Sequence, residues 1–366
     1  MMTRPDREPE PFSSNAIRLS PGELIRAAAI VLMATVVGPE AWRAVEPFDP
    51  DADYRIPYEL SEDYWLFRRY SRFASARDHT LLIGDSVIWG QYVDRDETLA
   101  HHLNELTGTV RYSNLGVDGT HPMALAGLLR YYGRAIRDRE VILHLNPLWL
   151  SSPQSDLQTR QEVHFNHPRL VPQFAPPIPS YTETVSGRLG IVLERRVRFL
   201  EWIRHLQSVC FDQMSLQQWT VENPYANPLR RISLQLPEAD AHRDPGARPA
   251  PAPGRSRPSL PWVDLETSLQ WRAFRRLIDV LEGRGNRLLV IVGPLDEHRL
   301  HPDNVTVYRD LLEGIGTALR ERGVESLLLP LLPAEWYADL SHPIGPGYAS
   351  LAEHIMRTIR AREDLP

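Results

Sequence analysis

The feature of this sequence that most constrains its fold is the alternation of short apolar runs with helix-like segments between residues 80 and 145. The apolar runs at 80–84, 110–114 and 141–145 have the length of buried parallel strands. The segments between them, 97–106 and 123–136, have apolar residues at helical spacing. Because parallel strands need crossover connections, this order predicts a βαβαβ unit.

The same alternation returns after residue 286. Strand-like runs at 288–292 and 325–329 flank a predicted helix over 305–322, and a final helix is predicted over 347–360. The two halves together predict a three-layer α/β/α domain with a mainly parallel sheet. Residues 47–78, before the first strand, are expected to form a polar connection.

Residues 151–285 interrupt this pattern and predict a largely helical insertion into the domain. The stretch 187–210 has apolar residues at helical spacing, so it predicts one amphipathic helix. The stretch 237–261 has seven prolines in 25 residues and predicts an exposed flexible loop. Such a loop serves either as a solvated tether or as a lid or partner surface.

An apolar segment near the start of the chain indicates either targeting or packing. Residues 27–38 are apolar, follow four arginines and have the length of a signal-peptide core. Over 23–45 the segment predicts an uncleaved membrane anchor or a cleaved export signal, with an N-terminal core helix as the alternative. The first two place the domain outside the cytoplasm, and the third leaves it cytoplasmic. Residues 1–22, rich in Pro, Arg and Glu, predict a disordered tail.

Composition excludes several classes of protein. With 41 basic against 47 acidic residues, the formal charge is −6, which gives no electrostatic footprint for nucleic acid. The single cysteine, Cys210, excludes an intramolecular disulfide and a multi-cysteine zinc site. The pairs His164/His167 and His298/His301 have metal-like spacing but lack a clear third ligand, so we expect no metal and no other cofactor.

A serine stands just beyond the first predicted strand, within residues 84–90. Ligands bind at the carboxyl ends of strands in open α/β sheets, and a serine there is a nucleophile if a base activates it. Asp339 and His342 lie in the loop between the last predicted strand and helix, at the same edge. Ser86, His342 and Asp339 therefore form a candidate catalytic triad. The alternative is that Ser86 caps a helix and the other two stabilise a loop.

Two further residues at strand ends are candidates for stabilising an oxyanion. Gly116 follows the second strand and presents an unobstructed backbone N–H group, and Asn146 follows the third and offers its amide. With the N–H group of Ser86 they would complete an oxyanion hole. The alternative is that Gly116 and Asn146 are turn residues. Asp85 is expected to hold the turn and to point away from the site.

These residues resemble the motif blocks of the SGNH, or GDSL, hydrolase superfamily. The first block, Gly-Asp-Ser with a glycine four residues after the serine, is matched at 84–90. The second, Asn-x-Gly-x-x-Gly, is matched at 114–119, and the fifth, Asp-x-x-His, at 339–342. The third usually reads Gly-x-Asn-Asp. Here residues 144–147 read His-Leu-Asn-Pro, which keeps the asparagine but loses the glycine and the aspartate.

The resemblance covers residues 78–150 and 286–362 and implies a flavodoxin-like SGNH hydrolase domain over 46–366. It implies a serine esterase that hydrolyses acyl esters, O-acetyl or similar, through an acyl-enzyme on Ser86. The alternatives are an O-acyltransferase that modifies a cell-envelope polysaccharide, or a catalytically silent scaffold of the same machinery.

Three features resemble the membrane-tethered extracytoplasmic members of the superfamily. They are the apolar N-terminal segment and the residues at 146–150 and 293–298. Those members are similar to proteins of alginate O-acetylation and teichoic-acid D-alanylation. In that branch the partners would be a polysaccharide and a membrane-bound acyl donor.

Overall fold

A computed structural model describes residues 19–160, 166–236 and 258–363 of the chain. The chain divides into two compact units, Met1–Glu46 and Pro47–Pro366. Most of the tail predicted over 1–22 and of the loop predicted over 237–261 lies outside the described residues.

The first unit contains the described helix α1 (Pro21–Val45). It begins at Pro21 because the Ser20 hydroxyl accepts a hydrogen bond from the N–H group of Glu23, whose carboxylate accepts one from the N–H group of Ser20. The predicted disordered tail therefore ends before residue 22. At 1.5 Å per residue α1 is about 37 Å long. One helix of the described chain is thus long and apolar enough to span a membrane, a test that a signal sequence also passes.

The second unit is built on a five-stranded parallel sheet in the order β2-β1-β3-β4-β5. The strand order reverses between β1 and β3, and α/β sheets bind ligands at such switch points. All five predicted strands are present. Strand β2 begins two residues later than predicted, and each of the others differs from its predicted bounds by one residue at one end. The strands are β1 (Thr80–Ile83), β2 (Tyr112–Asn114), β3 (Glu140–Leu145), β4 (Arg287–Val292) and β5 (Glu325–Leu328).

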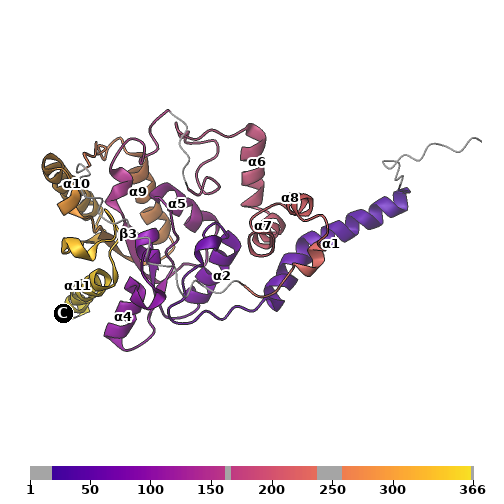
Figure 1. Cartoon of the computed structure of the whole chain (residues 1–366), viewed down its shortest axis with the longest axis horizontal. Coiled ribbons are helices and arrows are strands. Elements are labelled where there is room, and N and C mark those ends of the chain that lie inside the picture. The colour runs from indigo at the N-terminus through magenta and orange to yellow at the C-terminus, as the bar shows by residue number, and fades with distance from the viewer. Residues whose placement is uncertain (1–18, 161–165, 237–257, 364–366) are drawn as a thin grey trace, which may run out of the picture. The chain divides into compact units, whose positions relative to one another are not determined.

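Helices cover both faces of this sheet (Figure 1). Leu81 and Ile83 of β1 belong to a core shared with α2, α5, α9 and α10, whereas Leu82 belongs to a second core shared with α4 and α11. This alternation is the two-residue period of a strand buried on both sides. The bounds of these helices are α2 (Tyr64–Ser75), α4 (Leu99–Thr107), α5 (Pro122–Tyr131), α9 (Leu269–Glu282), α10 (Pro302–Glu321) and α11 (Gly345–Glu363).

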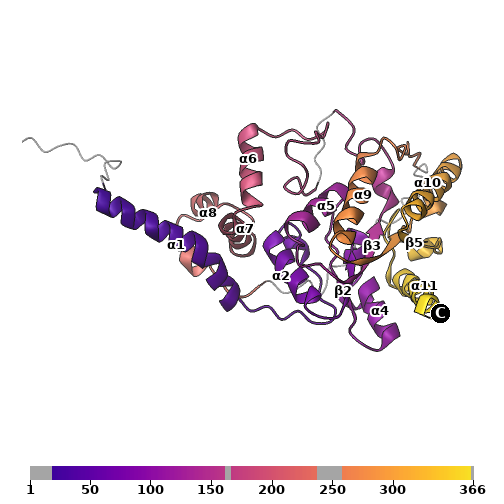
Figure 2. The ribbon, with the colours of Figure 1, turned by 180° about the vertical axis from the view of Figure 1, so that it is seen from behind.

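Two of these helices differ from the sequence prediction. Helix α2 forms within the expected polar connection 47–78, because its aromatic and apolar side chains gather on a buried face and leave its three arginines partly exposed. Helix α9 lies within the predicted insertion 151–285, yet it packs against α5 and leads into β4 (Figure 2). The predicted insertion therefore includes one helix of the α/β core.

The prediction of one helix over 187–210 is wrong. The structure has two, α6 (Val185–Glu194) and α7 (Arg198–Cys210), followed by the shorter α8 (Leu216–Glu222). The break contains neither glycine nor proline. It occurs at Arg195, whose guanidinium donates to the backbone oxygens of Arg169 at 2.8 Å and Val171 at 2.6 Å. A tertiary contact therefore ends α6.

Candidate active site

Ser86 is the first residue of α3 (Ser86–Trp89), a single helical turn directly after β1. The Asp85 carboxylate caps this turn by accepting a 3.0 Å hydrogen bond from the N–H group of Val87. The turn ends at Gly90, whose φ of 90° lies in the left-handed region that favours glycine. Ser86 is 8% exposed, so the turn holds its hydroxyl at the edge of the packed interior.

The three predicted triad residues lie together. The Ser86 hydroxyl oxygen is 2.8 Å from Nε2 of His342, although the two residues are 256 positions apart. Nδ1 of His342 is 2.8 Å from each carboxylate oxygen of Asp339. Because a carboxylate only accepts, Nδ1 carries the hydrogen, and Nε2 is left to accept the hydroxyl proton of Ser86.

The loop between β5 and α11 holds Asp339 and His342 in this geometry. One Asp339 oxygen also accepts hydrogen bonds from the N–H groups of Ser341 at 2.9 Å and His342 at 3.0 Å. The backbone N–H group of Ala338 donates to the oxygen of His342 at 2.8 Å, which closes the loop. The three-residue spacing therefore folds into a local turn that points the carboxylate at the imidazole.

The two groups shift each other's ionisation. Burial opposes ionisation of Asp339, but the hydrogen bond and charge of His342 outweigh it, so the pKa of Asp339 is lowered. Burial also opposes protonation of His342, but the hydrogen bond and charge of Asp339, with the charges of Asp85 and Asp118, raise the pKa of His342. The environment thus favours an imidazolium, the state that follows removal of the serine proton.

Asp85 does more than hold the turn. Its second oxygen accepts hydrogen bonds from Nδ2 of Asn146 and Nε1 of Trp149, both at 2.9 Å. Burial disfavours its charge, but the charge and hydrogen bond of His144 and the charge of His342 lower the pKa of Asp85 to about 2. An ionised carboxylate therefore joins the ends of β1 and β3 behind the Ser86 turn.

His144 occupies the position where the third block of the superfamily has glycine. Its Nδ1 lies 3.2 Å from the Asp85 carboxylate, and its Nε2 donates to the backbone oxygen of Gly293 at 2.7 Å. A side chain on Gly84 would lie 2.8 Å from Cβ of His144, so the absence of a side chain at Gly84 makes room for it. His144 thus links the ends of β3 and β4.

The two predicted oxyanion donors lie against the same turn but are engaged in hydrogen bonds. The N–H group of Gly116 donates to the side-chain oxygen of Asn114 at 3.0 Å. A Cβ on Gly116 would lie 2.3 Å from the backbone nitrogen of Trp89, so only glycine fits there. Asn146 uses one of its two amide hydrogens on Asp85 and keeps the second.

Sequence reasoning missed the residue that supports the far side of the turn. Arg55 is fully buried, and its guanidinium donates to the backbone oxygens of Gly90 at 2.7 Å and Val93 at 3.1 Å. It also lies 4.0 Å from the centre of the Trp89 ring. Arg55 belongs to no motif and lies in a polar connection, so nothing in the sequence pointed to it.

Tyr92 was also missed and lies beside the candidate base. Its ring contacts the imidazole of His342 edge-on, with 5.5 Å between ring centres. Its φ of 67° is uncommon for a residue with a side chain, and strained backbone of this kind clusters at functional sites. No spacing or motif in the sequence indicates this position.

The histidine pairs with metal-like spacing have other roles where they are described. His167 lies 2.7 Å from the backbone oxygen of Asp118, and His301 caps the start of α10. His164 lies outside the described residues. Among the described residues, one group of side chains is close enough to share a metal ion, namely His101, His102 and Glu105, with ligand atoms within 4.8 Å. Nδ1 of His101 lies 2.9 Å from the Asp53 carboxylate, and Nδ1 of His102 lies 3.2 Å from that of Glu105.

Comparison of the chain with models of known protein families and with curated proteins gave no match. The chemistry of the site therefore rests on its own geometry. A hydroxyl aligned with an oriented imidazole can lose its proton and attack an electrophilic carbon.

Proposed function

We propose that this protein is a serine hydrolase of the SGNH, or GDSL, type that acts on acyl esters. The observation that carries the proposal is the unbroken line of hydrogen bonds from Ser86 through His342 to Asp339 at the carboxyl edge of the sheet. The strand order β2-β1-β3-β4-β5 is that of the flavodoxin-like doubly wound fold, which supports the assignment.

The proposed reaction proceeds through an acyl-enzyme. His342 takes the hydroxyl proton as the Ser86 oxygen attacks the ester carbonyl carbon, and the tetrahedral intermediate collapses when His342 returns the proton to the leaving alcohol. Water then attacks the acyl-serine by the same route in reverse and releases the acid. Asp339 holds the imidazole and stabilises its charged form. These steps need no cofactor.

The oxyanion of each intermediate would be held by the N–H group of Ser86 and by the second amide hydrogen of Asn146. Gly116 can join them if its N–H group leaves the side chain of Asn114. This third contact would form only when negative charge develops on the substrate oxygen. A donor engaged in this way favours the transition state over the bound ester.

A second candidate function is O-acyl transfer to a cell-envelope polysaccharide. Helix α1 favours it, because a tether at a membrane would keep the site near a membrane-bound acyl donor. We propose that α1 anchors the chain with its larger unit on the extracytoplasmic side. In transfer, a sugar hydroxyl replaces water as the group that attacks the acyl-serine.

The test is turnover of p-nitrophenyl acetate by the purified chain, with and without a glycan acceptor. Serine-dependent release of nitrophenol supports the acyl-enzyme, and acylated glycan among the products selects transfer. Ser86→Ala and His342→Ala should abolish turnover and labelling by a fluorophosphonate, whereas Ser208→Ala on α7 should retain both. A folded chain that neither turns over nor labels would instead be a silent scaffold.

A further inference from the structure

The exposed apolar side chains of the larger unit are concentrated on the helices of its insertion. Of the seventeen large apolar side chains that are exposed in the described chain beyond Val45, ten lie between residues 185 and 234. Soluble proteins seldom gather exposed apolar side chains in this way, and where they do the patch marks an interaction surface.

Helix α6 shows this surface most clearly. Val185, Leu189 and Leu193 follow one another at four-residue spacing, so they form a stripe along one side of the helix. They are 67%, 51% and 54% exposed, and α6 buries none of its residues. Beyond α7, Val221 of α8 and Leu229 are also exposed, each to 75%.

The insertion helices are nevertheless fixed to the domain. On α7 the Glu201 carboxylate accepts hydrogen bonds from the guanidinium of Arg68 on α2 at 2.7 and 2.9 Å. Nδ1 of His205 lies 2.6 Å from the carboxylate of Asp63, and both side chains are buried. The apolar surface therefore belongs to helices that are fixed to the domain through α7.

The charge of this segment indicates what kind of partner the apolar surface contacts. Residues 185–236 contain seven arginines and four acidic residues, although the whole chain has a net charge of −6. Arg196 and Arg230 are exposed among the apolar side chains. Apolar side chains beside arginines, together with the exposed ring of Tyr225, suit the boundary between acidic headgroups and acyl chains, where tyrosine is enriched.

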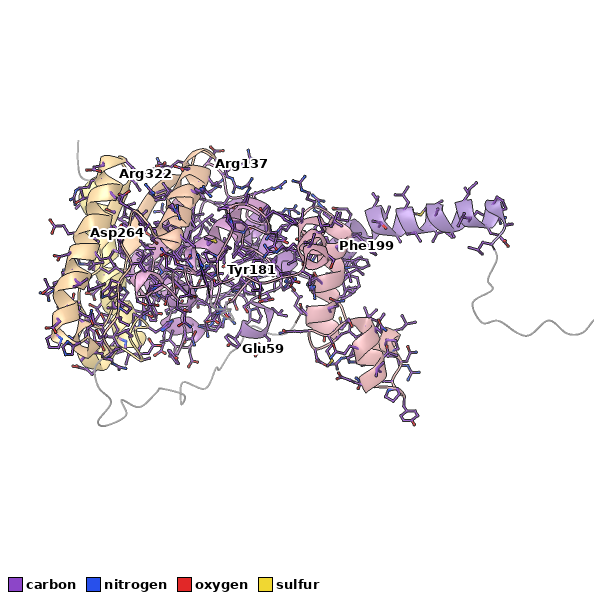
Figure 3. All side chains as sticks on the ribbon, turned by 90° about the horizontal axis from the view of Figure 1, so that it is seen from above. Glu59, Arg137, Tyr181, Phe199, Asp264 and Arg322 are labelled. Carbon is purple, nitrogen blue, oxygen red and sulfur yellow. The ribbon has the colours of Figure 1, made fainter. Side chains whose placement is uncertain are left out.

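We propose that the apolar, basic surface of α6, α7 and α8 lies against the anionic surface of the membrane that α1 spans. The inference rests on the proposed anchoring by α1, and its ligand is the headgroup region of acidic phospholipids. Phe199 of α7 lies at the opposite end of the larger unit from Asp264 and Arg322 (Figure 3), so one end would face the lipid and the other would face away.

The experiment places one fluorescent label on the full chain in vesicles of phosphatidylglycerol and brominated phosphatidylcholine. Cys210→Ala removes the single cysteine, and a cysteine is then introduced by Leu189→Cys, Val221→Cys, Leu32→Cys on α1, or Val307→Cys on α10. Val307 is 46% exposed and serves as the matched control away from the surface. We expect brominated lipid to reduce emission at least about twofold at 189, 221 and 32, and to leave 307 unchanged.

Quenching at 32 but not at 189 or 221 would overturn the inference and leave the anchor in place. Quenching at none of the sites would overturn both. A label at 189 that is unquenched in vesicles but shielded in native membranes would assign the surface to a protein partner. Arg196→Gln with Arg230→Gln should weaken quenching at 189, and an unchanged signal would contradict the role of acidic headgroups. Ester turnover, measured in the same vesicles, reports on the proposed function separately.

Discussion

Asp85 and Asn146 are joined by a 2.9 Å hydrogen bond in which the buried carboxylate accepts from the side-chain amide. The two residues follow β1 and β3, the strands between which the strand order reverses. Since one amide hydrogen is held by Asp85, the orientation of the second is fixed as well. The residue before the candidate nucleophile thus positions a candidate oxyanion donor.

Asp85→Asn should destabilise the fold and lower turnover. The new amide nitrogen would face Asn146 and Trp149 as a donor, and each buried donor left without an acceptor costs on the order of 1–3 kcal/mol. The measurement is urea unfolding beside Asp78→Asn, whose parent side chain is fully exposed and should change stability little.

The same variant has a pH signature. The pKa of Asp85 is about 2 in the folded chain against 3.8 ordinarily, so its charge stabilises the fold above pH 3.8 and this contribution is lost as the pH falls towards 2. The stability difference between wild type and Asp85→Asn should therefore shrink over that window. A difference that stays constant down to pH 2 would contradict the assignment.

Asn146→Ala should lower kcat by about 10²–10³ with a small change in KM, because an oxyanion donor acts mainly in the transition state. Asn227→Ala is a matched control. Each asparagine precedes a proline and accepts a hydrogen bond from the N–H group two residues on, Leu148 or Leu229, but Asn227 lies in the insertion. Equal losses in both variants would show that Asn146 only stabilises its turn.

The strands and the placement of the candidate triad were predictable from the sequence because their signals are local. Each central strand is an apolar run of strand length, and β1, β3 and β4 are buried on both faces. Parallel strands bring their carboxyl ends to one edge, so residues that follow them meet there whatever their separation in the chain. Ser86 and His342 are such a pair.

The remaining features depend on contacts that spacing does not encode. The end of α6 is set by Arg195 reaching the backbone of Arg169 and Val171. The contact between Asp85 and His144, and the engaged N–H group of Gly116, arise from side chains that meet only after the sheet has formed. The sequence pattern predicts which residues lie at the edge of the sheet, but it does not predict the hydrogen bonds that they form there.

Arg55→Gln should destabilise the chain on the order of 3 kcal/mol or more, because it removes charge-assisted hydrogen bonds to buried backbone oxygens of the loop after Ser86. The measurement is thermal unfolding with fluorophosphonate labelling below the transition, where we expect slower labelling because Gly90 and Val93 lose their support. Arg287→Gln, at a side chain 81% exposed, is the control and should be nearly neutral. A stable Arg55→Gln chain that labels at the wild-type rate would show that the loop keeps its structure without Arg55.

Asp339→Asn tests how the base is tuned. The base must be neutral to accept the serine proton, so kcat/KM should fall as the pH drops through the pKa of His342, which lies above the ordinary 6.5 mainly because of Asp339. Asp339→Asn should lower that pKa, move the acidic limb of the profile to lower pH, and reduce kcat by about 10⁴ through loss of the oriented tautomer. Asp118→Asn removes a charge that also raises the pKa of His342, so it should move the limb in the same direction by less and retain most of kcat. If Asp339→Asn left the limb in place, His342 would not be the titrating base.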